Sequence, residues 1–174
     1  RYLQEDEKAC FLVVGDGPSV TVFKEIFSER KVGKRLILAG KRTGQSLYDA
    51  YKAMDLFVFS SKSETQGIVV AEAMAAETPV VALDASGVRE VVADGVNGRL
   101  LGADVDAGEF ASVIKDFFQH QAAAESLRAH AIETAKALDR FKCAKDLAAL
   151  YDEIKETPFS EQTDPAAAFG SWDD

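Results

Sequence analysis

Five short apolar segments, each followed by residues with helical spacing, most constrain the fold of this chain. The segments are residues 9–15, 35–40, 56–60, 79–83 and 99–101. Most are continuous runs of Val, Ile, Leu and Phe, without the polar alternation of a strand that has one face in water. The pattern predicts a doubly wound parallel α/β sheet, buried on both sides by helices. Ligands of such sheets bind at the carboxyl ends of the strands.

Helical spacing predicts the covering helices and a later, purely helical region. The covering helices are expected over residues 18–31, 47–54, 68–76 and 88–93. Asp106 and Glu109 then form a capping box, with aspartate at the N-cap and glutamate three residues later, ahead of an amphipathic helix. C-terminal helices follow at 122–137 and around 147–154. We expect one domain over residues 1–157 and an acidic tail over 158–174.

Net charge and hydropathy exclude several classes of protein. The 174 residues carry a net charge of −9, whereas a whole-domain nucleic-acid binder is normally basic. No apolar run is long enough to span a membrane, and the charged N-terminus lacks the apolar stretch of a signal peptide. Position 1 is Arg, so we expect a piece of a longer, cytoplasmic gene product.

Cysteine and histidine offer no metal site. Cys10 and Cys143 lie far apart in apolar-patterned segments, which predicts two reduced, packed thiols. His120 and His130 have no cysteine or carboxylate cluster at ligand spacing, so we expect no metal.

Basic side chains gather between residues 30 and 42, where no acid occurs. Lys41 and Arg42 follow the second predicted strand and are expected to face the ligand edge of the sheet. The others precede that strand and are expected at the opposite edge: Arg30, Lys31, Lys34 and Arg35.

The most informative loop follows the third predicted strand. Gly67 stands where an apolar helix begins, so the amides of Gly67, Ile68 and Val69 lack intrahelical partners and can bind a phosphate. Glu72 lies further along this helix among apolar neighbours, where a carboxylate must find a hydrogen-bond partner. A ligand hydroxyl, a nearby loop or a base could each be that partner. Glu64 lies in the polar turn before the helix.

Residues 63–82, SETQGIVVAEAMAAETPVVA, resemble the E-x7-E signature of the retaining glycosyltransferases built from two Rossmann-like domains, the glycosyl transferases group 1. The resemblance extends from FLVVGDGP at 11–18 to DGVNG at 94–98, roughly half of the chain. The letters ETQG at 64–67 are most similar to members that glucosylate diacylglycerol. The resemblance implies a Rossmann-like donor-binding domain that takes a UDP- or GDP-sugar as substrate, with no cofactor and no metal.

The resemblance also implies roles for individual residues. Glu72 would hold the ribose hydroxyls, and Glu64 would contact the donor sugar and stabilise charge near the anomeric carbon. The amides at the helix start would bind the diphosphate, and residues 40–42 would lie against the base. The first strand-to-helix turn, at 15–18, is also explained by a tight turn alone. The candidate site comprises catalytic Glu64 and donor-binding Gly15, Gly17, Gly40, Lys41, Arg42, Thr65, Gln66, Gly67, Ile68, Val69 and Glu72.

The sequence departs from the family's pattern at two places, and a third position, Glu90, needs an assignment. Glu77 stands where the family usually has Gly, which predicts an altered helix end without catalytic consequence. Ser86 and Gly87 replace a usual Gly-Gly pair, which would narrow the sugar pocket. Glu90 is interpreted as a charge at a helix start rather than a ligand contact.

The family's Arg and Lys that neutralise the diphosphate belong upstream and are absent from residues 1–10. The N-terminal acceptor-binding domain is an expected partner that is also absent. We therefore expect this piece to be inactive alone and to bind a nucleotide sugar weakly if at all. A lipid acceptor would place the parent at the cytoplasmic face of a membrane, and no nucleic-acid partner is expected.

Two other functions stay open at this point. A noncatalytic α/β interaction or receiver module would need an acidic cluster at the strand ends, and Asp16, Asp55 and Asp84 do not form a phosphoacceptor pattern. Half of a nucleotide-sugar epimerase would share the architecture but needs a histidine in the cleft. His120 and His130 fall on late predicted helices instead.

Overall fold

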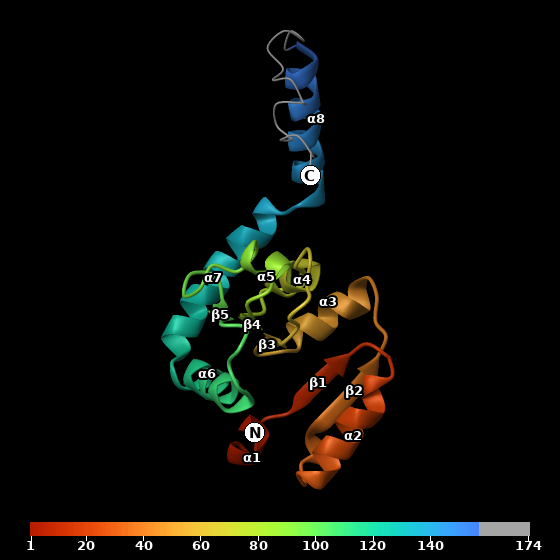
Figure 1. The fold of residues 1–174 in the computed structure, drawn as a ribbon, viewed down its shortest axis with the longest axis vertical. Helices are drawn as coiled ribbons and strands as arrows, with labels where there is room; N and C mark the ends of the chain where they lie inside the picture. The colour runs from red at the N-terminus through yellow and green to blue at the C-terminus, as the bar shows by residue number, and fades with distance from the viewer. Residues whose placement is uncertain (157–174) are drawn as a thin grey trace, which may run out of the picture. The chain divides into compact units, whose positions relative to one another are not determined.

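A computed structural model describes residues 1–156, apart from the side chains at positions 121 and 123. Strands and helices alternate from the N-terminus, and three helices end the described part (Figure 1). The strands are β1 (Phe11–Val14), β2 (Leu36–Gly40), β3 (Phe57–Phe59), β4 (Val80–Leu83) and β5 (Arg99–Leu101). The helices are α1 (Tyr2–Glu5), α2 (Ser19–Glu29), the 3-10 turn η1 (Gly33–Arg35), α3 (Gln45–Lys52), α4 (Ile68–Ala75), α5 (Ser86–Arg89), α6 (Ala107–Gln119), α7 (Gln121–Ala137) and α8 (Arg140–Glu156).

All five predicted strands are present and parallel, but they form two hydrogen-bonded sheets. β1 pairs with β2, and β4 pairs with β3 on one side and β5 on the other. In each sheet the chain moves outward strand by strand, which is the winding of a doubly wound sheet. The predicted parallel α/β class is confirmed. The expectation of a single sheet is not met, because β1 and β3 form no ladder within residues 1–156.

Burial differs among the strands. β4 is buried along its whole length, because it has a paired strand on each side. β1, β3 and β5 are half-buried, and Ile37 on β2 is 49% exposed. The expectation that the strands are buried on both faces therefore holds fully only for β4, since each other strand forms the edge of its sheet.

The apolar core surrounds α4 and β4. Val70, Ala73 and Met74 of α4 are fully buried, as expected for a helix that is apolar nearly all round. They belong to one cluster with Val80 of β4 and Val88 of α5. Figure 1 shows α4 and α5 side by side next to β4. This packing fixes the direction of α4, and with it the position of the turn that precedes the helix.

The predicted capping box is confirmed at the start of α6. Asp106 is the N-cap, and its carboxylate accepts from the amides of Gly108 and Glu109. The Glu109 carboxylate accepts in return from the Asp106 amide at 3.1 Å. Two of the helix's orphan donors and the N-cap amide are thereby satisfied by neighbours in sequence.

The end of α4 is not altered by the glutamate that stands at the usual glycine position. Glu77 itself adopts the left-handed conformation, with φ +62°. The amide of Thr78 donates to the Ala73 carbonyl and that of Glu77 to the Met74 carbonyl, both at 2.9 Å. These two bonds are the Schellman pattern. The prediction of an altered turn was wrong, because the chain accepts the strained backbone and keeps the turn.

Glu90 is not at a helix start, which corrects the expectation from the sequence. Helix α5 begins at Ser86, two residues earlier than predicted, and Glu90 is its C-cap. The Ala85 backbone before the helix is extended, and the Val88 and Arg89 amides both donate to the Ala85 carbonyl. Ser86 and Gly87 therefore lie inside the helix that sequence periodicity placed after them.

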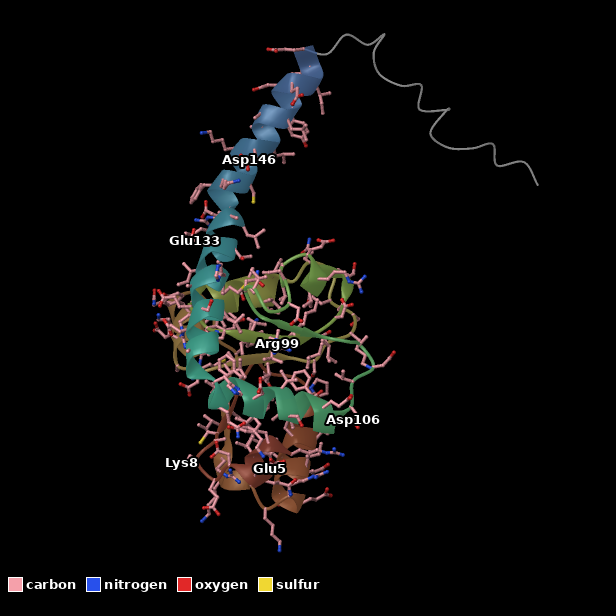
Figure 2. All side chains as sticks on the ribbon, turned by 90° about the vertical axis from the view of Figure 1, so that its left-hand side faces the viewer. Glu5, Lys8, Arg99, Asp106, Glu133 and Asp146 are labelled. Atoms are coloured by element: carbon pink, nitrogen blue, oxygen red, sulfur yellow. The ribbon has the colours of Figure 1, made fainter. Side chains whose placement is uncertain are left out.

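The short N-terminal helix α1 was not predicted, because four residues carry no periodicity. It packs against α6: the ring of Tyr2 stacks on Phe118 with centroids 5.7 Å apart, and Glu5 pairs with Lys115 at 2.8 Å. Figure 2 shows Glu5 beside the α6 ribbon, which begins near the labelled Asp106. A contact between distant parts of the chain thus determines this helix.

The chain divides into two compact units after Lys136. In the described part of the second unit, α8 is one long helix. Its apolar side chains are about half exposed or more: Phe141, Leu147, Leu150, Tyr151 and Ile154. The predicted boundary at 157/158 stays a prediction, and the tail over 158–174 lies outside the described residues.

Both cysteines are free but exposed, so the expectation of packed thiols was wrong. Cys10 lies in the segment just before β1, and Cys143 lies on α8. Apolar neighbours in sequence misled the prediction, because the strand that follows Cys10 is only half-buried and α8 has exposed apolar residues.

Candidate functional site

The turn from Glu64 to Gly67 gathers backbone donors on one carboxylate oxygen. Oε1 of Glu64 accepts from the amides of Thr65 at 3.1 Å, Gln66 at 3.0 Å and Gly67 at 3.0 Å. The amides of Gln66 and Gly67 above all, with that of Thr65, lower the pKa of the Glu64 carboxyl below its ordinary value. No bond that the structure shows uses its second oxygen, Oε2. The carboxylate is thus ionised and oriented by the main chain alone.

Two glycines fix the backbone of this turn against α5. A Cβ on Gly87 would lie 2.2 Å from the Gln66 nitrogen, and a Cβ on Gly67 would lie 2.5 Å from the Gly87 carbonyl oxygen. The Gly87 amide also donates to the Glu64 carbonyl at 2.9 Å. Ser86, the residue expected to narrow the sugar pocket, is exposed. The close approach of the two backbones therefore depends on Gly87.

Gly67 is the N-cap of α4, as predicted, and it adopts a left-handed conformation with φ +67°. Its carbonyl accepts from the amides of Val70 and Ala71, each at 3.0 Å. The amides of Ile68 and Val69 occupy the first two helical positions, which have no intrahelical acceptor. The structure thus places two helix-start amides beside the Glu64 carboxylate, while the Gly67 amide already donates to that carboxylate.

Glu72 finds its hydrogen-bond partner on α3. The hydroxyl of Tyr51 donates to Oε2 of Glu72 at 3.1 Å. Of the partners considered from the sequence, neither a base nor a loop supplies this bond. Tyr51 is 7% exposed, and burial together with the Glu72 charge raises the pKa of its hydroxyl. The hydroxyl therefore remains a proton donor over the whole physiological range.

Sequence reasoning missed Tyr51 as a site residue. It stands in an apolar stripe with Leu47 and Met54, which marks it as a core residue, and it does belong to the core. The available signal was the hydroxyl, because a buried tyrosine usually requires a hydrogen-bond partner. Which partner it meets depends on how α3 packs on α4, and that is a tertiary contact.

The predicted residues on the first sheet lie in the loops after β1 and β2. The Gly15 amide donates to the Gly40 carbonyl at 3.0 Å, which ties the two loops together. Gly17 donates to the Asp16 carboxylate in the tight turn that was predicted. Lys41 and Arg42 are exposed. Among the described residues, no hydrogen bond or ion pair joins either side chain to Glu64 or Glu72, so the structure brings together two local groups rather than one.

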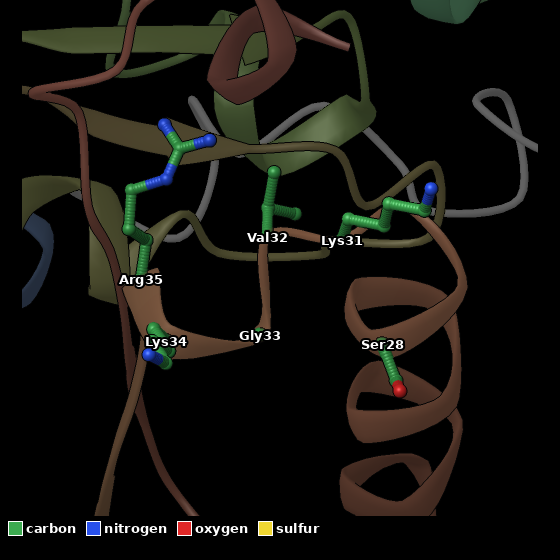
Figure 3. Close-up of a pocket in the computed structure, with 6 residues that line it drawn as sticks. All are labelled: Ser28, Lys31, Val32, Gly33, Lys34 and Arg35. Atoms are coloured by element: carbon green, nitrogen blue, oxygen red, sulfur yellow. The ribbon is translucent and has the colours of Figure 1, made fainter.

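The basic residues between positions 30 and 35 lie before β2, at the end of the strand opposite to Lys41 and Arg42, as expected. A hollow of about 640 Å³ opens there (Figure 3). Arg35 does not point freely into it, because its guanidinium donates to the carbonyls of Asp6 at 2.5 Å and Ala9 at 3.4 Å. Arg35 thus connects η1 to the segment before β1 and has a structural role at this hollow. It is lined by Ser28, Lys31, Val32, Gly33, Lys34 and Arg35.

Two of the three aspartates named from the sequence, Asp16 and Asp84, are engaged locally. Asp16 accepts from the Gly17 amide, and Asp84 pairs with Arg89 at 2.8 Å.

Over residues 1–156, no three His, Cys, Asp or Glu side chains are grouped as metal ligands. In the same part of the chain, no helix is long and apolar enough to cross a membrane.

Several curated relatives are similar to part of this chain. Sulfoquinovosyl transferase SQD2 from Arabidopsis thaliana is 37% identical over 92 residues, covering 53% of this chain and 17% of the relative. Alpha-monoglucosyldiacylglycerol synthase from Streptococcus pneumoniae is 33% identical over 98 residues, covering 56% and 22%. D-inositol 3-phosphate glycosyltransferase from Mycolicibacterium smegmatis is 36% identical, with the same coverage. The chain thus spans about a fifth of the length of these relatives.

Solved structures show the same fold at lower identity. Anabaena HepE in complex with UDP-glucose has a TM-score of 0.76 and 24% identity, covering 90% of this chain and 43% of that one. The pneumococcal O-GlcNAc transferase GtfA, in complex with UDP and GlcNAc, has a TM-score of 0.77 and 20% identity, covering 90% and 31%. The family model "Glycosyl transferases group 1" matches residues 1–138, most of the chain. The chain therefore belongs to the glycosyl transferases group 1 family.

Proposed function

We propose that this chain is the donor-binding half of a retaining, metal-independent glycosyltransferase. The reaction would transfer a sugar from a UDP- or GDP-sugar to an acceptor held by an N-terminal domain. One observation carries the proposal: the helix-start amides of α4 stand in sequence between Glu64 and Glu72, and each of these carboxylates is oriented by its own hydrogen bonds. Such an arrangement suits a ligand with a diphosphate between two polyhydroxylated groups.

Glu64 has the properties of a group that stabilises positive charge on a donor sugar. Three amides hold Oε1 in place, which leaves Oε2 to accept a hydrogen bond from a sugar hydroxyl. Its lowered pKa keeps the group ionised when the anomeric carbon becomes electron-poor. The backbones of the turn and of α5 are closely packed at Gly67 and Gly87, where an added Cβ would meet neighbouring backbone atoms.

The leaving diphosphate would be bound at the start of α4. The amides of Ile68 and Val69 are the donors for it, supported by the positive end of the helix dipole. The Gly67 amide serves Glu64 instead, so it contributes to the site through that carboxylate. Lys41 and Arg42 would add positive charge from the loop after β2. Glu72 would accept the ribose hydroxyls from within the same helix.

The proposed N-terminal domain holds the acceptor, so the identity of the acceptor depends on that domain and not on this chain. One of the relatives above, the alpha-monoglucosyldiacylglycerol synthase, is named after a glucosylated diacylglycerol. A lipid acceptor would place the parent at the cytoplasmic face of a membrane. Sugar transfer would also require the acceptor domain. We therefore expect the isolated chain to bind donor without turnover.

Saturation-transfer NMR tests the proposal on the chain as it is. UDP, GDP and UDP-glucose are each offered at millimolar concentration, and saturation of the ribose protons is measured. We expect transfer to the ribose for UDP or GDP, and loss of most of it in Glu72→Ala. Glu77→Gln, at the other end of α4, is the matched control and should retain the signal.

A different result would reject the proposal. If no nucleotide receives saturation, even from a longer chain that includes the upstream segment, the chain is an interaction module and not a donor site. If Glu72→Ala and Glu77→Gln behave alike, the ribose assignment is wrong, although nucleotide binding as such would stand.

A further inference from the structure

Tyr51 is a core residue whose hydroxyl reaches a residue of the proposed donor site, Glu72. Its ring lies edge-on against Phe57 of β3, with centroids 5.5 Å apart and planes at 76°. Its carbonyl accepts from the buried Thr78 hydroxyl at 2.8 Å. Its own hydroxyl donates to Glu72. The residue is thus held at its main chain by the turn before β4, at its ring by β3 and at its hydroxyl by α4.

The Glu72 side chain depends on this hydroxyl for its direction. Its immediate neighbours, Ala71 and Ala73, offer no donor, and the Tyr51 bond is the hydrogen bond that the structure shows for the carboxylate. A half-buried glutamate without it would sample several rotamers. With Oε2 held, Oε1 has a set direction, and Oε2 keeps a further lone pair. The two oxygens can therefore receive a vicinal diol without a search for the right rotamer.

We infer that Tyr51 is a positioning residue of the donor site, which holds the Glu72 carboxylate in the orientation that accepts both ribose hydroxyls. This inference rests on the proposed function, because it requires Glu72 to contact a ribose. Tyr51 acts through Glu72 and makes no contact with the donor itself. It lowers the entropy that the glutamate loses on binding, which is the usual gain from preorganisation.

Tyr51→Phe removes the hydroxyl and keeps the ring in its place against Phe57. UDP affinity is measured by NMR titration of the chain, with circular dichroism to verify folding. We expect UDP to bind about three- to tenfold more weakly, the loss associated with one side chain that must be ordered on binding. Tyr51→Phe should lower the affinity for 2′-deoxy-UDP by a smaller factor than the affinity for UDP, because 2′-deoxy-UDP offers Glu72 only one ribose hydroxyl.

A double-mutant cycle separates positioning from a purely structural role. In a Glu72→Ala background, Tyr51→Phe should have no further effect on UDP affinity, since the group that it orients is gone. Equal losses for UDP and 2′-deoxy-UDP, or an undiminished loss in the Glu72→Ala background, would overturn the inference. So would an unchanged UDP affinity in Tyr51→Phe when Glu72→Ala weakens binding.

One further measurement needs no substitution. With tyrosine labelled at Cζ, the Tyr51 signal should shift on addition of UDP with the same midpoint as binding, because ribose hydroxyls that also donate to Glu72 change the charge on the oxygen that the Tyr51 hydroxyl contacts. A constant Tyr51 signal during saturation with UDP contradicts the inference. If Glu72→Ala leaves UDP affinity unchanged, the fault lies with the proposed function, and the inference falls with it.

Discussion

At the scale of single residues, the two glutamates of the candidate site find their hydrogen-bond partners in different ways. Glu64 takes its partners from the next three amides along the chain, an arrangement that the sequence did not predict. The amide at the helix start, at Gly67, was expected to bind a phosphate and donates to the Glu64 carboxylate instead. Glu72 takes its partner from another helix. No reading of neighbours along the chain identifies Tyr51, because only packing brings it there.

Glu77 provides a test of backbone strain at one residue. Its left-handed conformation costs about 1 kcal/mol or more for a residue with a Cβ, whereas its exposed ion pair with Lys52, at 2.7 Å, contributes about 0–1 kcal/mol. We expect Glu77→Gly to raise the free energy of unfolding by about 0.5–1 kcal/mol in urea denaturation. The Arg128 bond to the Glu77 carbonyl is kept in this variant.

Lys52→Ala is the control, because it removes the same ion pair without changing φ at position 77. It should lower the free energy of unfolding by no more than about 1 kcal/mol. A loss of stability in Glu77→Gly as large as that in Lys52→Ala would show that the strained turn carries no appreciable energy.

At the scale of elements, sequence patterns located what local chemistry determines. All five strands, the start of α4 and the capping box of α6 follow from apolar runs, a glycine and an Asp-x-x-Glu spacing. The start of α5 was misplaced, because Ser86 and Gly87 read as a loop. Helix α5 is positioned by its contact with the turn that carries Glu64. The only sign of this tertiary contact in the sequence is Gly87, where a side chain would not fit.

Gly87→Ala tests that contact between α5 and the site turn. The added Cβ would meet backbone atoms of Thr65 and Gln66 at 2.2–2.7 Å, and backbone cannot rotate away as a side chain can. We expect a loss of about 3 kcal/mol in unfolding free energy, at the upper end for overpacking. Gly102→Ala is the matched control, since its Cβ would meet nothing within 4 Å. Equal urea midpoints for the two variants would refute the close approach.

At the scale of the whole molecule, the fold class was predictable and the distribution of burial was not. Apolar strands predicted a parallel α/β protein, which the structure and the family match confirm. The sequence did not predict that β1 and β2 form a separate, half-buried sheet. An apolar run indicates a strand, but it does not indicate which elements pack beside that strand. For the same reason the exposure of both cysteines was missed.

Two kinds of segment offer binding groups to an anion. The start of α4 follows β3 and the loop with Lys41 and Arg42 follows β2, whereas the hollow around η1 precedes β2. We propose that a nucleoside diphosphate binds at the start of α4 and not in the hollow. The acidic net charge of the chain does not decide this, because local amides dominate at short range.

Titration of the ¹⁵N-labelled chain with UDP distinguishes the two binding places, since it reports on the backbone amides of both. We expect the amide signals of Ile68, Val69 and Glu72 to shift together with a single midpoint. The signals of Gly33 and Lys34, in the hollow, should stay in place. Shifts confined to Gly33 and Lys34, with the α4 signals unmoved at saturating UDP, would show that UDP does not bind at the start of α4.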